Sequence, residues 1–138
     1  MNNTYNFNDE SFKSTSSYKN FITSNPSQGF LKIRAYAASQ AIPISSLKVV
    51  VSKNIDGNNV IFFEGTTNES GVIERITLPT PKLDPNNLDA PSSTTYEITA
   101  TYAKDNVSNI YRVNMYENIY VVQTINIVPD INGMAGGV

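Results

Sequence analysis

The sequence predicts an all-β fold: a seven-stranded antiparallel sandwich of two sheets, preceded by an extended N-terminal arm. Short runs of β-branched and aromatic residues recur between turn signals from residue 29 onward. No window shows a sustained helical period, and 138 residues suffice for one core but not for two. We therefore expect an arm over residues 1–28, a sandwich domain over residues 29–129 and a glycine-rich tail over residues 130–138.

The arm is rich in Asn, Ser and Thr and ends in the turn cluster of residues 25–29. A flexible linker would not need aromatic residues, yet the arm holds five, namely Tyr5, Phe7, Phe12, Tyr18 and Phe21. We expect these side chains to make assembly contacts. Two arrangements remain open, because the arm can fold over its own sandwich or add Tyr5 and Phe7 as a strand to the sheet edge of a neighbouring copy.

The seven strands are expected at residues 30–37, 47–53, 60–64, 71–78, 95–102, 108–115 and 119–128. Strict alternation in residues 96–102 places Tyr96, Ile98, Ala100 and Tyr102 on one face. A turn at residues 56–59 predicts a hairpin between the second and third strands. Four prolines in residues 79–91 predict a long loop where the chain changes sheets, because proline cannot donate to a sheet ladder.

Composition excludes several kinds of chemistry. The chain has no His and no Cys, which removes the commonest general base, the commonest zinc ligands and thiol nucleophiles. No serine lies in a Gly-x-Ser-x-Gly elbow, and the carboxylates lie singly along the strands. We therefore predict no catalytic residue, no metal and no cofactor, and the chain is not expected to be an enzyme.

Charge and hydropathy also constrain the partners. A net charge of -2 with ten scattered basic residues gives no positive stripe for nucleic acid. No apolar run is long enough to span a membrane, and no basic and apolar leader opens the chain. We expect synthesis in the cytoplasm without a signal peptide, and neither nucleic acid nor membrane as partner.

An intramolecular isopeptide bond would need a buried Lys, an Asn or Asp on the last strand and a nearby Glu. Lys32, Asn126 and Glu97 lie on suitable strands. The alternation, however, places Lys32 and Glu97 on the faces opposite the core, where this triad would not form unless the strand register slips by one.

The strand tyrosines allow two interpretations. They could form a platform on which sugar rings stack, or they could be ordinary sandwich residues with solvated hydroxyl groups. The tyrosines concerned are Tyr96, Tyr102, Tyr111, Tyr116 and Tyr120.

Several segments of residues 29–129 resemble the transthyretin-like or carboxypeptidase-regulatory-like (prealbumin-like) β-sandwich modules. The resemblance rests on residues 29–33 leading to 41–44, on residues 47–51, and on residues 67–72 running into Leu78 and Pro79. The version in clostridial spore proteins is the most similar, including the non-catalytic part of spore cortex-lytic enzyme precursors, because residues 123–129 also fit. Asp105 and Asn106 stand where that family usually has a Gly-Tyr pair.

This resemblance implies a seven-strand, two-sheet fold and a binding or structural role rather than catalysis. We accordingly expect a structural subunit that self-assembles by strand exchange through its arm, on a spore surface, appendage or filament. The alternatives are a carbohydrate- or peptidoglycan-binding module and a phage-like particle subunit. The expected partners are other copies of the chain and a surface glycan, and the expected final location is a spore or particle surface.

Overall fold

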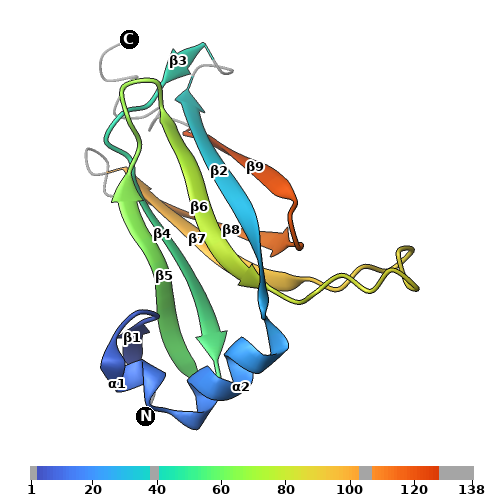
Figure 1. Cartoon of the computed structure of the whole chain (residues 1–138). Coiled ribbons are helices and arrows are strands. Elements are labelled where there is room, and N and C mark those ends of the chain that lie inside the picture. Colours follow the sequence, from blue (N-terminus) through green and yellow to red (C-terminus); the bar gives the residue numbers. More distant parts are fainter. Residues whose placement is uncertain (1–2, 38–40, 103–106, 128–138) are drawn as a thin grey trace.

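The computed structural model describes residues 3–37, 41–102 and 107–127 and has two β-sheets packed face to face (Figure 1). The five-stranded sheet has the order β1 (Thr4–Asn6), β5 (Asn58–Thr66), β4 (Lys48–Ile55), β7 (Thr94–Tyr102) and β8 (Val107–Met115). The second sheet is centred on β2 (Ser27–Ala37), which pairs with β3 (Ile42–Pro43), β6 (Val72–Thr80) and β9 (Tyr120–Asn126).

All seven predicted strands are present, but the predicted seven-stranded, purely antiparallel sandwich is wrong in two respects. The described chain has nine strands, because β1 and β3 add short pairings to the sheets. Both sheets are mixed, since β1 runs parallel to β5 and β9 runs parallel to β2. The parallel pairing of β9 joins segments about 90 residues apart, which local sequence patterns do not encode.

The arm contains two helices, α1 (Glu10–Lys13) and α2 (Ser16–Ser24), which the sequence analysis missed. The Thr15 hydroxyl oxygen caps α2 by accepting a hydrogen bond from the Tyr18 backbone N–H at 3.2 Å. Tyr18, Phe21 and Ile22 recur at intervals of three and four and pack against the core. This stripe is short, and its polar neighbours hide the helical period.

The arm packs on its own chain rather than extending away from it. Thr4 pairs with Asn59 at the edge of the five-stranded sheet, and α2 lies across one end of the sandwich (Figure 1). Phe12 has no exposed surface, and Phe21 is also buried in the core.

The core follows the predicted alternation. Leu31, Ile33 and Ala35 of β2 are fully buried, as are Ile98 and Ala100 of β7. Tyr96 is buried between the sheets, and its hydroxyl donates a hydrogen bond to the Pro79 carbonyl at 2.5 Å. The hydrogen bond satisfies the polar end of an otherwise apolar residue.

Two connections match the sequence prediction. Asp56 and Gly57, with φ of 53° and 86°, form the tight turn between β4 and β5. Residues 81–93 connect β6 in one sheet to β7 in the other and project from the body (Figure 1). The predicted tail, residues 130–138, lies outside the described residues.

Candidate functional site

The arm and the sandwich meet in a cluster of aromatic rings. Phe7 follows β1 and stacks on Phe62 of β5, with the ring centroids 4.4 Å apart and the planes 25° from parallel. Phe21 of α2 meets the edge of Phe7 at 5.9 Å, and Phe62 in turn meets Tyr96 at 5.0 Å. The cluster therefore fixes the arm to the core, since such ring pairs stabilise beyond the area that they bury.

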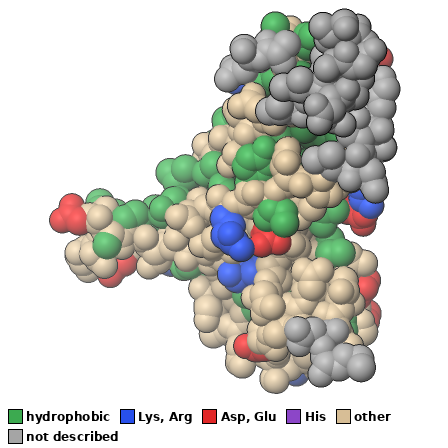
Figure 2. All heavy atoms as spheres, turned by 180° about the vertical axis from the view of Figure 1, so that it is seen from behind, with side chains coloured by type: hydrophobic (Ala, Val, Ile, Leu, Met, Phe, Trp, Pro, Cys, Tyr) green, Lys and Arg blue, Asp and Glu red, His purple; other side chains and the backbone are tan. Residues whose placement is uncertain are grey.

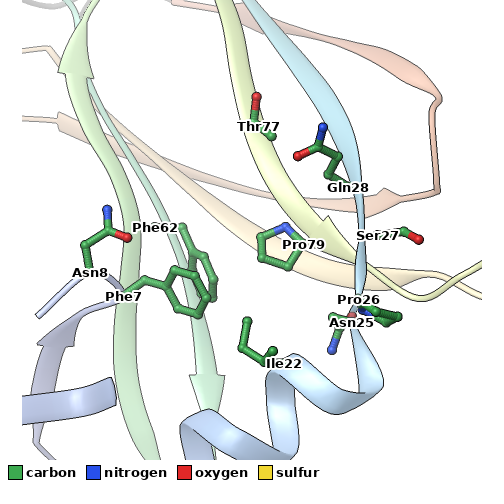
Figure 3. A pocket seen from close by; sticks show the side chains of 10 residues that line it. All are labelled: Phe7, Asn8, Ile22, Asn25, Pro26, Ser27, Gln28, Phe62, Thr77 and Pro79. Atoms are coloured by element: carbon green, nitrogen blue, oxygen red, sulfur yellow. The ribbon is translucent and has the colours of Figure 1, made fainter. Parts of the chain in front are cut away.

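Beside this cluster lies a pocket of about 340 Å³, which we call the aromatic pocket (Figure 3). Its ten lining residues come from the arm, the start of β2, β5 and β6, and they are Phe7, Asn8, Ile22, Asn25, Pro26, Ser27, Gln28, Phe62, Thr77 and Pro79. The two phenylalanine rings lie on one side, opposite Pro79 and the strands β6 and β2 (Figure 3). Its volume is within the range of small-molecule sites.

Three polar side chains in the aromatic pocket are available to a ligand. Asn8, Gln28 and Thr77 are exposed, and no hydrogen bond joins their side chains to another described residue. Asn25 differs, because its amide donates to the Phe21 carbonyl at 2.9 Å and accepts from the Thr94 hydroxyl. Asn25 therefore holds the end of α2, while the other three can bind.

The aromatic pocket carries no formal charge, since none of its ten residues is Asp, Glu, Lys or Arg. Ser27 does not supply a reactive hydroxyl, because strand alternation turns its side chain away from the other lining residues (Figure 3). That hydroxyl instead donates to Glu117 at 2.7 Å. The pocket therefore suits an uncharged ligand with an apolar face and a hydrogen-bonding edge.

Glu117 fastens the root of the projecting loop. Its carboxylate accepts the Leu83 backbone N–H at 2.8 Å as well as the Ser27 hydroxyl. The hydrogen bond from Leu83 and, to a smaller extent, the one from Ser27 hold the pKa of Glu117 below its usual value. The charge of Lys82 lowers this pKa further. Glu117 is therefore ionised at neutral pH and ties together β2, the loop and the turn before β9.

A second pocket of about 300 Å³, which we call the lysine pocket, lies between α2 and the end of β4. Its polar lining is formed by Ser17, Asn20, Ser24, Lys53, Asn54 and Asp56, and Phe21, Ile55 and Asn25 complete it. The Lys53 ammonium donates to the Thr95 carbonyl at 2.9 Å and lies 5.9 Å from the centre of the Tyr96 ring. Burial lowers the pKa of Lys53.

The structure brings together the five aromatic residues singled out in the arm. Phe12 packs against Tyr5 and Tyr18 at 5.3 and 5.7 Å, and Phe7 and Phe21 continue the cluster. All five contact the core of their own chain. The prediction that they contact another copy is not tested by this arrangement.

The three residues of the proposed isopeptide triad are not brought together. Lys32 forms an ion pair with Glu74 at 3.7 Å, whereas Glu97, in the other sheet, pairs with Arg112 at 3.4 Å. Asn126 lies opposite Tyr36, four positions along β2 from Lys32 and so about 13 Å away.

The strand tyrosines do not form one platform. Tyr96 is buried, Tyr102 and Tyr111 pack against the core, and Tyr120 is exposed beside Phe30 on the second sheet. Across residues 3–37, 41–102 and 107–127, no three Asp and Glu side chains gather to hold a metal ion. None of the helices in the described part of the chain is long and apolar enough to cross a membrane.

The face of the molecule that points away from the viewer in Figure 1 carries few charged side chains. Lys and Arg side chains gather near its middle beside an acidic group, and uncharged side chains and backbone cover much of the rest (Figure 2). On the five-stranded sheet, Lys48 and Glu64 pair at 3.1 Å.

Sequence analysis missed most of the aromatic pocket. Phe7 was singled out, but Gln28, Phe62 and Thr77 were not, because the pocket joins segments far apart in the sequence and no motif spans them. The adjacent Phe62 and Phe63 were the available signal, but the register shift of β5 against β4 at Phe62, which sets the direction of that ring, has no local sequence marker.

No protein-family model matches the sequence, and no curated protein matches it either. Among solved structures, Klebsiella pneumoniae 5-hydroxyisourate hydrolase aligns with a TM-score of 0.52 at 17% identity, over 73% of this chain and 90% of that one. The structure of (S)-allantoin synthase aligns with a TM-score of 0.49 at 13% identity, over 77% and 42% of the two chains. Transthyretin from Sparus aurata aligns at 0.44 and 12% identity, over 70% and 90%.

The likeness to the Klebsiella hydrolase shows a transthyretin-like fold and confirms that part of the resemblance. It also overturns a prediction. The expected non-enzymatic, self-assembling structural subunit rested on the absence of His, Cys and catalytic motifs and on a family resemblance that implied no catalysis, yet the same fold carries a hydrolase. That prediction is wrong, because a fold shared with an enzyme gives no ground for excluding enzymatic activity.

Proposed function

We propose that this protein binds a small, flat, uncharged heterocycle with amide-type ring edges in the aromatic pocket. The observation that carries the proposal is the combination of a stacked phenylalanine pair with unpaired amide and hydroxyl groups, in a pocket without a charged residue. A flat ring contacts Phe7 and Phe62 through its apolar face. Its N–H and C=O groups pair with Gln28 and Thr77, which can both donate and accept.

The absence of charge around the pocket supports the uncharged class of ligand. A charged ligand would leave solvent for a site whose ten lining side chains offer no counter-charge, at a cost in desolvation. A ligand with an amide edge replaces its hydrogen bonds to water with direct hydrogen bonds to the pocket, so its desolvation costs little free energy.

Binding of uracil and hypoxanthine, measured by isothermal titration calorimetry on the full chain, tests the proposal. We expect saturable binding of at least one of these probes, and no binding of toluene, which has a flat face but no polar edge. Thr77→Ala should weaken binding about fivefold or more, because one hydrogen bond is lost.

Thr66→Ala is the matched control. Thr66 is also an exposed threonine on a strand, but it lies on β5 outside the pocket. Equal binding by the wild type and the Thr77→Ala and Gln28→Ala variants would refute the proposed site.

5-Hydroxyisourate, named for the Klebsiella enzyme, is a heterocycle that also has amide-type ring edges, and it is included as a probe. Its decay is followed by absorbance with and without the protein. The result to look for is that the protein accelerates this decay, with Thr77→Ala reducing the acceleration and Thr66→Ala leaving it unchanged. That result would extend the proposal from binding to catalysis in this pocket.

The setting proposed for this binding is a spore or particle surface. Its support is the resemblance of residues 29–129 to the module of clostridial spore proteins. Fractionation of spores with an antibody against the chain tests it, and a signal confined to vegetative cells would contradict it.

A further inference from the structure

The lysine pocket differs from the aromatic pocket because its lining includes two charged side chains, Lys53 and Asp56. The Lys53 ammonium has three N–H bonds, of which one is given to the Thr95 carbonyl. Among the described residues no carboxylate lies within 4.0 Å of it, whereas Lys32, Lys48 and Arg112 each form an ion pair. Lys53 is thus a half-buried cation that retains donor capacity.

Helix α2 presents a polar stripe to this cation. Ser17, Asn20 and Ser24 recur at intervals of three and four, so they share one face of the helix. Their side chains form no hydrogen bond with another described residue. Asn54 adds an amide N–H₂, because only its oxygen is occupied, by the Gly57 backbone N–H at 2.9 Å.

These observations point to an anion. A cation that loses solvent on burial gains from an opposite charge, and hydroxyl and amide donors on the facing helix can bind the second oxygen of that group. Asp56 is the one carboxylate in the pocket lining. Its negative charge works against a dianion, so one carboxylate group suits the site better than a phosphate.

We infer that the lysine pocket binds a small organic carboxylate, with one carboxylate oxygen on Lys53 and the other facing the polar stripe of α2. A hydroxyl or ammonium substituent on the ligand would face Asp56. This site is separate from the aromatic pocket, and the two share only Asn25 among their lining residues.

Sodium acetate is titrated into the full chain labelled with ¹⁵N, with sodium chloride keeping the ionic strength constant. We expect saturable amide shifts confined to α2 and to the turn between β4 and β5. Lys53→Gln should weaken acetate binding by about tenfold or more, because the ligand's charge-assisted hydrogen bond is lost. Asp56→Asn should strengthen it about twofold by removing the like charge.

Lys48→Gln is the matched control, since Lys48 lies on the same strand, is exposed and points to Glu64 instead. Lys53→Arg keeps the charge and should bind acetate more tightly than Lys53→Gln, which separates loss of charge from loss of fold. Lactate and alanine, whose substituents can reach Asp56, should bind more tightly than acetate.

Three results would overturn the inference. The first is unchanged acetate binding in Lys53→Gln, and the second is an equal loss in Lys48→Gln. The third is tighter binding of inorganic phosphate than of acetate, which would exclude the carboxylate class. Failure of the aromatic pocket to bind uracil would leave all three measurements unaffected.

Discussion

At the scale of single residues, Thr80 and Thr94 show how a buried hydroxyl depends on its partner. Both side chains are buried at opposite ends of the projecting loop. The Thr94 hydroxyl donates to Asn25, whereas the Thr80 hydroxyl is the one buried side-chain polar group without a partner among the described residues. A buried hydroxyl without a hydrogen bond costs stability.

We therefore predict opposite effects of the same substitution at these two positions. Thr80→Val should stabilise the fold by about 1 kcal/mol, because it replaces an unpaired hydroxyl with a methyl group of similar size. Thr94→Val should destabilise it by about 1 to 2 kcal/mol, because the Asn25 oxygen loses its donor. Urea unfolding followed by circular dichroism measures both, and a destabilised Thr80→Val variant would contradict the assignment.

Glu117 predicts a dependence of stability on pH. Hydrogen bonds from Leu83 and Ser27 lower the pKa of Glu117 in the folded state below the ordinary 4.5. Its contribution is therefore fully present above about pH 4.5 and disappears as the pH falls through the lowered value. The melting temperature of the wild type should exceed that of Glu117→Gln at pH 7, and the difference should shrink in acid.

Ser27→Ala removes one of these two hydrogen bonds, so its pH dependence should lie between those of the wild type and Glu117→Gln. A difference in melting temperature that stays constant from pH 7 to pH 3 would show that Glu117 is not held in its ionised form.

At the scale of elements, the arm is the part that the sequence described least well. The aromatic residues correctly indicated that it docks, but its helices were missed because Asn, Ser and Thr dilute a stripe of only three apolar positions. The strands were easier, since the alternation in residues 94–102 is nearly unbroken and matches the observed burial. The local sequence pattern therefore predicts where the strands lie better than it predicts which strands pair with each other.

Phe12 lies at the centre of the arm's own aromatic cluster. It is fully buried and contacts both Tyr5 and Tyr18. Phe12→Ala should cost about 3 to 5 kcal/mol, the usual range for deleting a buried phenylalanine ring. Phe30→Ala is the control and should cost less, because Phe30 is only half-buried on the outer face of β2.

Chemical denaturation measures both phenylalanine variants. A loss for Phe12→Ala no larger than that of an ordinary surface substitution, about 0.5 kcal/mol, would mean that the arm contributes little to the folded state.

At the scale of the whole molecule, the sequence predicts the fold through positions where the backbone geometry allows only one type of residue. Gly71, in the turn that carried the family resemblance, has a φ of +76°, and a Cβ there would lie 2.5 Å from the Ala35 carbonyl oxygen. Only glycine satisfies that turn without strain, so the turn has a recognisable marker in the sequence. The aromatic and lysine pockets have no such marker, since ordinary Gln, Thr, Ser and Lys residues form them.

The projecting loop has a consequence for engineering of the molecule. Residues 81–93 carry neither helix nor strand, and Leu88 at the loop is 63% exposed. Because Glu117 fixes the base of this loop independently of its tip, a foreign peptide inserted near Leu88 would leave both sheets intact. An epitope or a fluorescent reporter can therefore be inserted into this loop and displayed away from both pockets.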